Sequence, residues 1–139
     1  MAQDRTRFPD DRDALVYDLA ASGELHRFAD ATPPGPDVAL AYFQLGEIES
    51  RVGRTFWLSQ ADIYLETSIR MAPGAPFAPQ ALAELRDFLV SGYTGSGGRE
   101  VPADVQTRLA ELSRLVEQAQ PPAPAATAPK RQVEPPTTR

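Results

Sequence analysis

Residues 91–102, SGYTGSGGREVP, are the stretch whose composition most invites a chemical role, because they hold four of the nine glycines of the chain. Glycine-rich loops cradle phosphates when they follow a strand with G-x-G-x-x-G spacing, or when they carry the lysine of a P-loop. Here Glu100 stands three positions after Gly97, where the third glycine is needed, and no lysine is within reach. The preceding residues read as a helix, not a strand. We therefore expect a connector between two helices, with Tyr93 as a candidate contact for a partner.

The titratable side chains form no recognisable catalytic or metal-binding set. His26 is the only histidine, and we expect it on the surface of the segment ELHRF. Glu47 and Glu49 are two positions apart on an expected helix, so they point in different directions and do not suit paired acid–base work. The chain has no cysteine, which excludes thiol catalysis, iron–sulfur clusters and disulfides. We expect no catalytic residue, no metal and no cofactor, and hence a protein that is not an enzyme.

The stretch RTFWLSQADIY, residues 54–64, is the best candidate for a binding face. Trp57, the only tryptophan, is followed at spacings of three and four by Gln60 and Tyr64, which places the three on one side of a helix. Two interpretations stay open: Trp57 packs over the end of a helical hairpin, or the three side chains open to a groove. Tryptophan and tyrosine often carry the binding energy of interfaces. The candidate partner-binding residues are Trp57, Gln60, Tyr64, Tyr93, Thr94 and Arg99.

Apolar residues recur at helical spacing along most of the chain, and no segment alternates as a strand does. We predict an all-α fold of about five helices. These helices are expected over residues 10–22, 36–53, 58–71, 76–91 and 102–118, with a short helical piece at 24–32. The organisation predicted is a flexible N-terminus over 1–9, a helical domain over 10–118 and a Pro/Ala-rich disordered tail over 119–139.

Glycines and apolar stripes define the expected boundaries and buried faces of these helices. Gly23 is expected to end the first helix, and Gly92 the fourth, because glycine is the usual residue at a helix C-terminus. The first helix is expected to bury Leu15, Val16 and Leu19. The second is expected to bury a stripe of Leu40, Phe43 or Gln44, Leu45, Ile48 and Val52.

The second and third expected helices carry small and large residues at a suggestive spacing. Gly46 closes a Tyr-x-x-Leu-Gly series, and the next helix has the small–large–small–proline series Ala61, Leu65, Ser68 and Pro73. Small residues let two antiparallel helices approach closely, and a proline stops the second helix so that another pair can begin. In these features residues 40–73 resemble a tetratricopeptide (TPR) repeat, which implies a stacked helical solenoid that binds proteins or peptides.

The sequence also departs from the TPR pattern in three ways. The segment RTFWLSQ lengthens the turn between the two helices, Glu49 replaces the late aromatic residue of the first helix, and the glycine-rich loop splits the second helix pair. Solenoids need about three repeats, and only two pairs are expected here. The short helical region over residues 10–31 is therefore a candidate N-terminal cap.

Charge and composition limit the classes of partner and the cellular compartments that we expect. The net charge is −5 and Lys130 is the only lysine, so a nucleic-acid surface, which needs clustered cations, is not expected. The first residues lack the apolar core of a signal peptide, and no apolar run is long enough for membrane insertion, so a cytoplasmic location is the default expectation. A chain cut from a longer exported protein would instead be periplasmic or part of a membrane complex.

We expect a non-catalytic scaffold or accessory subunit of a larger assembly, which binds a partner protein through a helical groove and the 92–100 loop. The arginine and alanine bias suggests that the assembly is bacterial. Two alternatives remain: a small-ligand-binding module with a pocket near Tyr64 and Tyr93, and an accessory domain of a longer enzyme. The sequence leaves self-association open.

Overall fold

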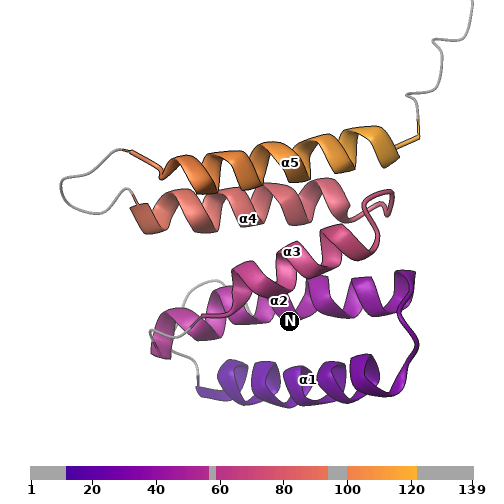
Figure 1. Ribbon diagram of the computed structural model, residues 1–139. Helices are drawn as coiled ribbons and strands as arrows, with labels where there is room; N and C mark the ends of the chain where they lie inside the picture. The colour runs from indigo at the N-terminus through magenta and orange to yellow at the C-terminus, as the bar shows by residue number, and fades with distance from the viewer. Residues whose placement is uncertain (1–11, 57–58, 94–99, 122–139) are drawn as a thin grey trace, which may run out of the picture.

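A computed structural model describes residues 12–56, 59–93 and 100–121, and these residues form five helices and no strand (Figure 1). The helices are α1 (Arg12–Ala31), α2 (Pro36–Phe56), α3 (Ala61–Met71), α4 (Ala78–Tyr93) and α5 (Ala103–Ala119). The predicted all-α fold is confirmed. Of the helices described, none is both long enough and apolar enough to cross a lipid bilayer.

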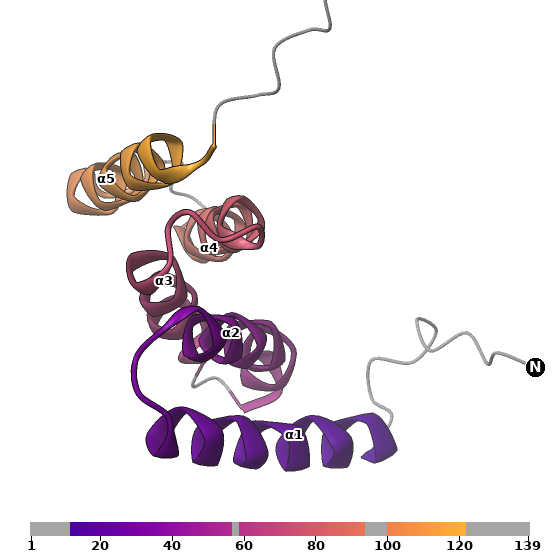
Figure 2. The ribbon, with the colours of Figure 1, turned by 90° about the vertical axis from the view of Figure 1, so that its right-hand side faces the viewer.

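The five helices are stacked in chain order, with α1 at one end and α5 at the other (Figure 1). In the view turned by 90°, the axes of α2 to α5 point nearly toward the viewer, whereas α1 runs across the view beneath α2 (Figure 2). Each helix therefore packs on its neighbours in the chain, and α3 also contacts α5.

The hydrophobic core lies between α2, α3, α4 and α5. Its fully buried large side chains are Leu45, Leu65, Ile69, Leu85 and Leu112. Ser68 is the one buried polar residue among those described, and its hydroxyl donates to the carbonyl of Leu65 at 2.7 Å, so it leaves no unsatisfied group. From Asp13 to Ala31, where burial is described, no residue of α1 is buried, so α1 is attached to the outside of this core.

A close helix contact is made where Leu65 of α3 lies on Gly46 of α2. A Cβ atom at position 46 would stand 2.6 Å from Leu65 Cγ, which is closer than real Cβ atoms come. Glycine is therefore required by packing here, as the spacing of small residues indicated. A second contact stacks the rings of Phe43 and Phe77 at 5.4 Å, which joins α2 to the residue before α4.

Charged side chains join α3 to α5 on one side of the stack. Glu66 of α3 accepts hydrogen bonds from Arg108 of α5 and from Arg70 of its own helix, the latter at 2.7 Å. Arg70 also reaches Glu111 at 2.9 Å, and Arg108 reaches Asp62 at 3.7 Å. Burial alone would raise the pKa of Glu66, but the hydrogen bonds from the two arginines outweigh it and hold the pKa below its usual value.

Several expectations for the first two helices were wrong. Gly23 does not end a helix, because α1 continues through it to Ala31 and absorbs the separate piece expected at 24–32. Val16 and Leu19 are exposed, and Leu40 is exposed as well. The buried apolar residues of α2 include Phe43, Leu45, Ile48 and Val52 of the predicted stripe, and Val38, Ala39 and Ala41 in place of Leu40.

The end of the fourth helix also differs from expectation. Gly92 and Tyr93 are the last residues of α4, so Gly92 is not the residue that stops the helix. The other helix boundaries lie within three residues of those predicted, apart from the extension of α1 beyond Gly23.

Replacing Gly46 tests the contact with Leu65. We expect Gly46→Ala to lower the free energy of unfolding by about 1–3 kcal/mol, because the added methyl group overlaps Leu65 and forces α2 and α3 apart. Gly92→Ala is the matched control: a Cβ there meets nothing within 4 Å, and alanine is the better helix former. Urea unfolding followed by circular dichroism measures both. Equal stabilities of the two variants would contradict the close packing.

The charge network predicts a specific response to acid. Since the folded pKa of Glu66 lies below its unfolded value, its stabilising effect is present above about pH 4.3 and is lost as the pH falls through the lower folded value. We expect Glu66→Gln to lower stability by about 1 kcal/mol at pH 7, after allowance for solvent screening, and to flatten the acid slope. Glu111→Gln, in the more exposed pair, should cost less. An unchanged acid slope in Glu66→Gln would exclude this role.

Candidate functional site

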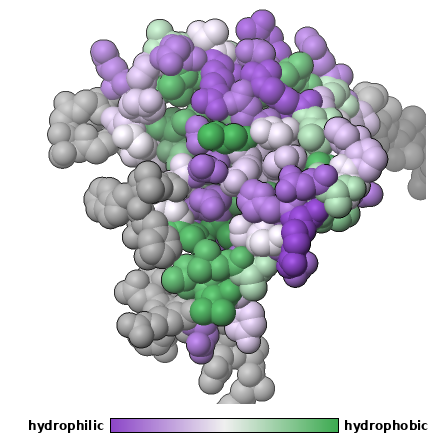
Figure 3. Space-filling model, turned by 60° about the horizontal axis from the view of Figure 1, so that its bottom comes forward, coloured by the Kyte–Doolittle hydropathy of each residue, from purple (hydrophilic) through white to green (hydrophobic). Residues whose placement is uncertain are grey.

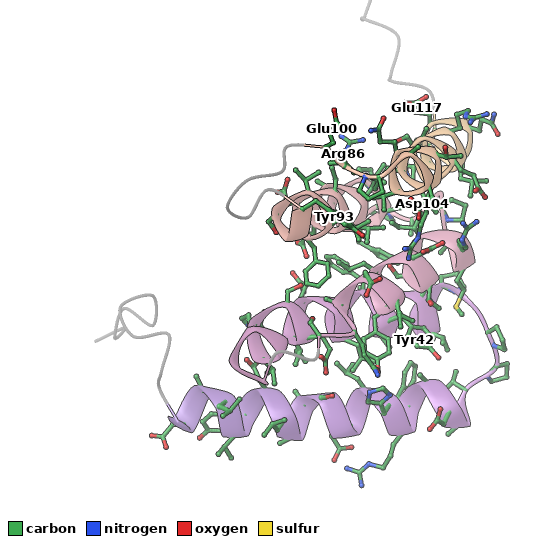
Figure 4. The ribbon with its side chains drawn as sticks, turned by 60° about the vertical axis from the view of Figure 1, so that its left-hand side comes forward. Tyr42, Arg86, Tyr93, Glu100, Asp104 and Glu117 are labelled. Atoms are coloured by element: carbon green, nitrogen blue, oxygen red, sulfur yellow. The ribbon has the colours of Figure 1, made fainter. Side chains whose placement is uncertain are left out.

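An aromatic cluster of His26, Tyr42 and Tyr64 lies where α1 meets α2 and α3. The rings of Tyr42 and Tyr64 stack with centroids 6.1 Å apart, and His26 meets Tyr64 edge-on at 5.5 Å. Figure 4 shows Tyr42 between the ribbons of α2 and α1. All three side chains are half-buried, so the cluster has both a packed side and a side open to solvent.

Hydrogen bonds hold the Tyr64 ring in one position. Its hydroxyl donates to Gln60 Oε1 at 3.0 Å and lies 3.3 Å from His26 Nε2. Burial raises the pKa of the Tyr64 hydroxyl, and the nearby Glu49 carboxylate and Tyr42 raise it further. Tyr64 is therefore a neutral hydroxyl at physiological pH, able to donate and to accept.

The turn before α3 is held against α2 by polar contacts. Ser59 Oγ donates to the carbonyl of Glu49 at 3.1 Å and accepts from the backbone N–H of Ala61 at 3.3 Å. The Glu49 carboxylate accepts from the backbone N–H of Gln60 at 3.4 Å. These contacts fix where α3 begins, and so they set the positions of Gln60 and Tyr64.

The structure brings together only part of the predicted partner-binding set. Gln60 and Tyr64 are hydrogen-bonded neighbours, whereas Tyr93 is the last residue of α4 and is exposed (Figure 4). Trp57, Thr94 and Arg99 lie outside the described residues.

Sequence reasoning missed two members of the cluster, His26 and Tyr42. His26 was expected on the surface, but it is half-buried against Tyr64, 38 positions away in the chain. The contact depends on α1 docking across α2 and α3, and no local spacing signals that docking. The position of Tyr42 one turn from Gly46 was the available hint, because helix spacing places it near the α3 contact.

A second polar site joins α1, α2 and α4. Arg51 of α2 makes a two-pronged contact with Asp18 of α1, from Nη2 at 2.9 Å and from Nε at 3.2 Å. Glu47, one turn earlier on α2, lies near Glu84 of α4. Burial first, and then the charge of Glu84, raise the pKa of Glu47, and Arg51 opposes both. This face of α2 and α4 therefore has an excess of negative charge.

An open hollow of about 640 Å³ lies between the end of α4 and the start of α5. Its lining combines apolar side chains with Arg86 and Glu100, which stand on the same edge of this helix pair (Figure 4). Neither Tyr64 nor Tyr93 lines it. Among the described residues, no three side chains suited to binding a metal ion lie together.

Comparison with known proteins adds no relative. No protein-family model matches the chain, and no curated protein or solved structure is significantly similar to it.

Neutralising Glu47 tests the charge crowding between α2 and α4. A raised folded pKa means that the ionised form destabilises the fold, so Glu47→Gln should raise stability at pH 7, by about 0.5 kcal/mol after solvent screening. The gain should shrink as the pH falls and Glu47 itself takes up a proton. Glu117→Gln, exposed on α5 (Figure 4), is the matched control. A loss of stability in Glu47→Gln at pH 7 would show that Arg51 outweighs Glu84.

Proposed function

We propose that this protein is a non-catalytic, TPR-like adaptor or accessory subunit of a bacterial assembly. It binds a partner protein where α1 meets the α2–α3 pair, at Gln60 and Tyr64, with Tyr93 at the end of α4 as a separate contact. The observation that carries the proposal is the aromatic cluster of His26, Tyr42 and Tyr64, which is half-buried and held in place by hydrogen bonds.

Such a cluster suits the recognition of a protein chain. A tyrosine whose ring and hydroxyl are already fixed loses little conformational freedom on binding, so more of its contact energy appears as affinity. It offers a flat apolar ring together with a hydroxyl that both donates and accepts, and tyrosine is enriched among the residues that dominate interfaces. Gln60 adds an exposed amide beside it.

The stacking of the helices supports the TPR-like part of the proposal. The pairs α2–α3 and α4–α5 follow one another, Gly46 receives Leu65 within the first pair, and Glu66 and Arg108 link the second helices of the two pairs. Repeated helix pairs that contact the next pair in this way form extended surfaces in solenoid proteins. The break between the pairs falls at Pro73-Gly74, as the small–large–small–proline series implies.

Affinity capture from the lysate of the source cell tests the proposal. We expect a partner protein to be recovered with the wild-type chain and to be reduced about tenfold with Tyr64→Ala, because a hot-spot tyrosine contributes more than 1.4 kcal/mol. Gln60→Ala, a change at an exposed side chain, should weaken recovery less. Ile63→Ala is the control, since Ile63 is exposed on the same helix but points elsewhere.

Circular dichroism keeps this experiment interpretable. Tyr64→Ala must retain the helix content of the wild-type chain at the temperature of capture. If it does not, Gln60→Ala replaces it as the variant that tests the binding site. Recovery of the same partner by all the variants, or by none including the wild type, would overturn the proposal.

A further inference from the structure

A carboxylate with unused capacity to accept hydrogen bonds lies beside the aromatic cluster. Glu49 is half-buried. Within the described part of the chain, its carboxylate accepts one hydrogen bond, from the backbone N–H of Gln60 at 3.4 Å, which is long for such a bond. A carboxylate offers about four positions for donors, and no arginine of the described residues forms an ion pair with this one. Glu49 can therefore accept further hydrogen bonds from a cation.

The arginines of α1 and α2 whose side chains the structure describes are paired elsewhere. Arg51, two positions after Glu49, makes its two-pronged contact with Asp18. Arg27 of α1 pairs with Glu24 of the same helix. Neither of them neutralises the charge beside the aromatic cluster.

Gln60 connects the Glu49 carboxylate to the aromatic cluster. Its backbone N–H donates to Glu49, and its side-chain Oε1 accepts from the Tyr64 hydroxyl at 3.0 Å. The carboxylate is close enough to this hydroxyl for its charge to raise the pKa of Tyr64, in addition to the larger effect of burial. Oxygen acceptors of three side chains therefore lie together beside the stacked rings of Tyr42 and Tyr64. A ligand that matches them carries positive charge, donates several hydrogen bonds and presents a flat surface to a ring.

We propose that the partner places an arginine side chain at this site. Its guanidinium lies against the exposed part of the Tyr64 ring, and its N–H groups point to the Glu49 carboxylate and to Gln60 Oε1. The proposal rests on the partner-binding function proposed for the cluster and names the side chain that the cluster recognises.

The geometry of the acceptors favours arginine over other side chains. A guanidinium is planar, holds five donors in a fixed fork and stacks on aromatic rings. The ammonium group of lysine is a compact and strongly hydrated charge, which does not make such paired contacts. A neutral or acidic side chain would leave the charge of Glu49 without a partner. The net charge of −5 also attracts a cationic segment before contact, which raises the rate of association.

A small probe suits the test, because the α1 end of the stack also has apolar surface. Val16, Tyr17 and Leu19 are exposed there, and Figure 3 shows an apolar area bordered by polar side chains. A long peptide would bind such a surface through its own apolar residues. N-acetyl-arginine amide has little apolar surface, and N-acetyl-citrulline amide is its uncharged counterpart of nearly the same shape.

Titration of the full chain with each probe, followed by NMR, tests the proposal. We expect the arginine probe to shift the ring signals of Tyr64 and of His26, the only histidine. It should bind about tenfold more tightly than the citrulline probe, because its hydrogen bonds to the carboxylate are charge-assisted. Glu49→Gln keeps an oxygen acceptor for the N–H of Gln60 but removes the charge, so it should abolish this preference. Glu117→Gln, which removes the same charge from an exposed position of α5, should leave the preference unchanged.

A second measurement, on the wild-type chain, does not depend on the folding of any variant. The affinity for the arginine probe should fall as the salt concentration rises from about 0.05 M to about 0.5 M, because salt screens the attraction between the two charges. The affinity for the citrulline probe should not change. Equal affinities for the two probes, or a preference for arginine that persists in Glu49→Gln, would overturn the proposal.

Affinity capture with the same variants separates this proposal from the function on which it rests. A partner recovered less with Tyr64→Ala but equally with Glu49→Gln would refute the arginine contact and leave the adaptor function in place. Selective binding of the arginine probe, with no partner protein recovered by the wild-type chain, would refute the adaptor function and support a site for a cation. A partner that is lost with both variants and retained with Glu117→Gln would support both proposals.

Discussion

The arrangement of the whole stack depends on the packing of Leu65 on Gly46. Because that contact sets the rotation of α3 about its own axis, it also fixes where the neighbouring side chains point. Tyr64, Leu65 and Glu66 follow one another at about 100° intervals around the helix, and each serves a different interface. Tyr64 reaches α1 and α2, Leu65 fills the core, and Glu66 pairs with Arg108 of α5. A rotation of α3 would disturb all three together, which is why one missing side chain, at Gly46, has consequences on both sides of the stack.

The two sides of the stack handle charge in opposite ways. Where α3 meets α5, arginines surround Glu66 and favour its ionised form; where α2 meets α4, burial and Glu84 disfavour the ionised form of Glu47, with only Arg51 in opposition. A fall in pH therefore weakens the contact of Glu66 with its arginines and reduces the repulsion between Glu47 and Glu84. A change of pH therefore acts in opposite directions on these two carboxylates, and the two effects on stability partly offset each other.

The sequence predicted much of the buried core, but it did not predict where α1 ends or how α1 docks on the other helices. The stripe of Leu45, Ile48 and Val52 was predicted and is buried, because α2 packs against both α1 and α3. Gly23 was misread because glycine ends a helix only when the chain turns there; with no turn residues after it, the hydrogen bonds of α1 simply continue. Of the residues at the site, the sequence predicted Gln60 and Tyr64, which are close in the chain and share a helix face. Its remaining members depend on where α1 docks. From Asp13 to Ala31 this helix has no buried residue, so no strong apolar periodicity in the sequence predicted its docking.

The shallow attachment of α1 makes the aromatic cluster dependent on the docking of this helix. Within the described residues, α1 is held on the core by half-buried side chains, by the Asp18–Arg51 ion pair and by His26 against Tyr64. A helix with so few buried contacts opens at low free energy, and when it opens the aromatic cluster loses His26. A partner that contacts Tyr64 together with His26 binds the docked helix better than the detached one, so it shifts that equilibrium toward docking. Docking of α1 and binding of a partner at Tyr64 therefore favour each other, because coupling between two such events is reciprocal.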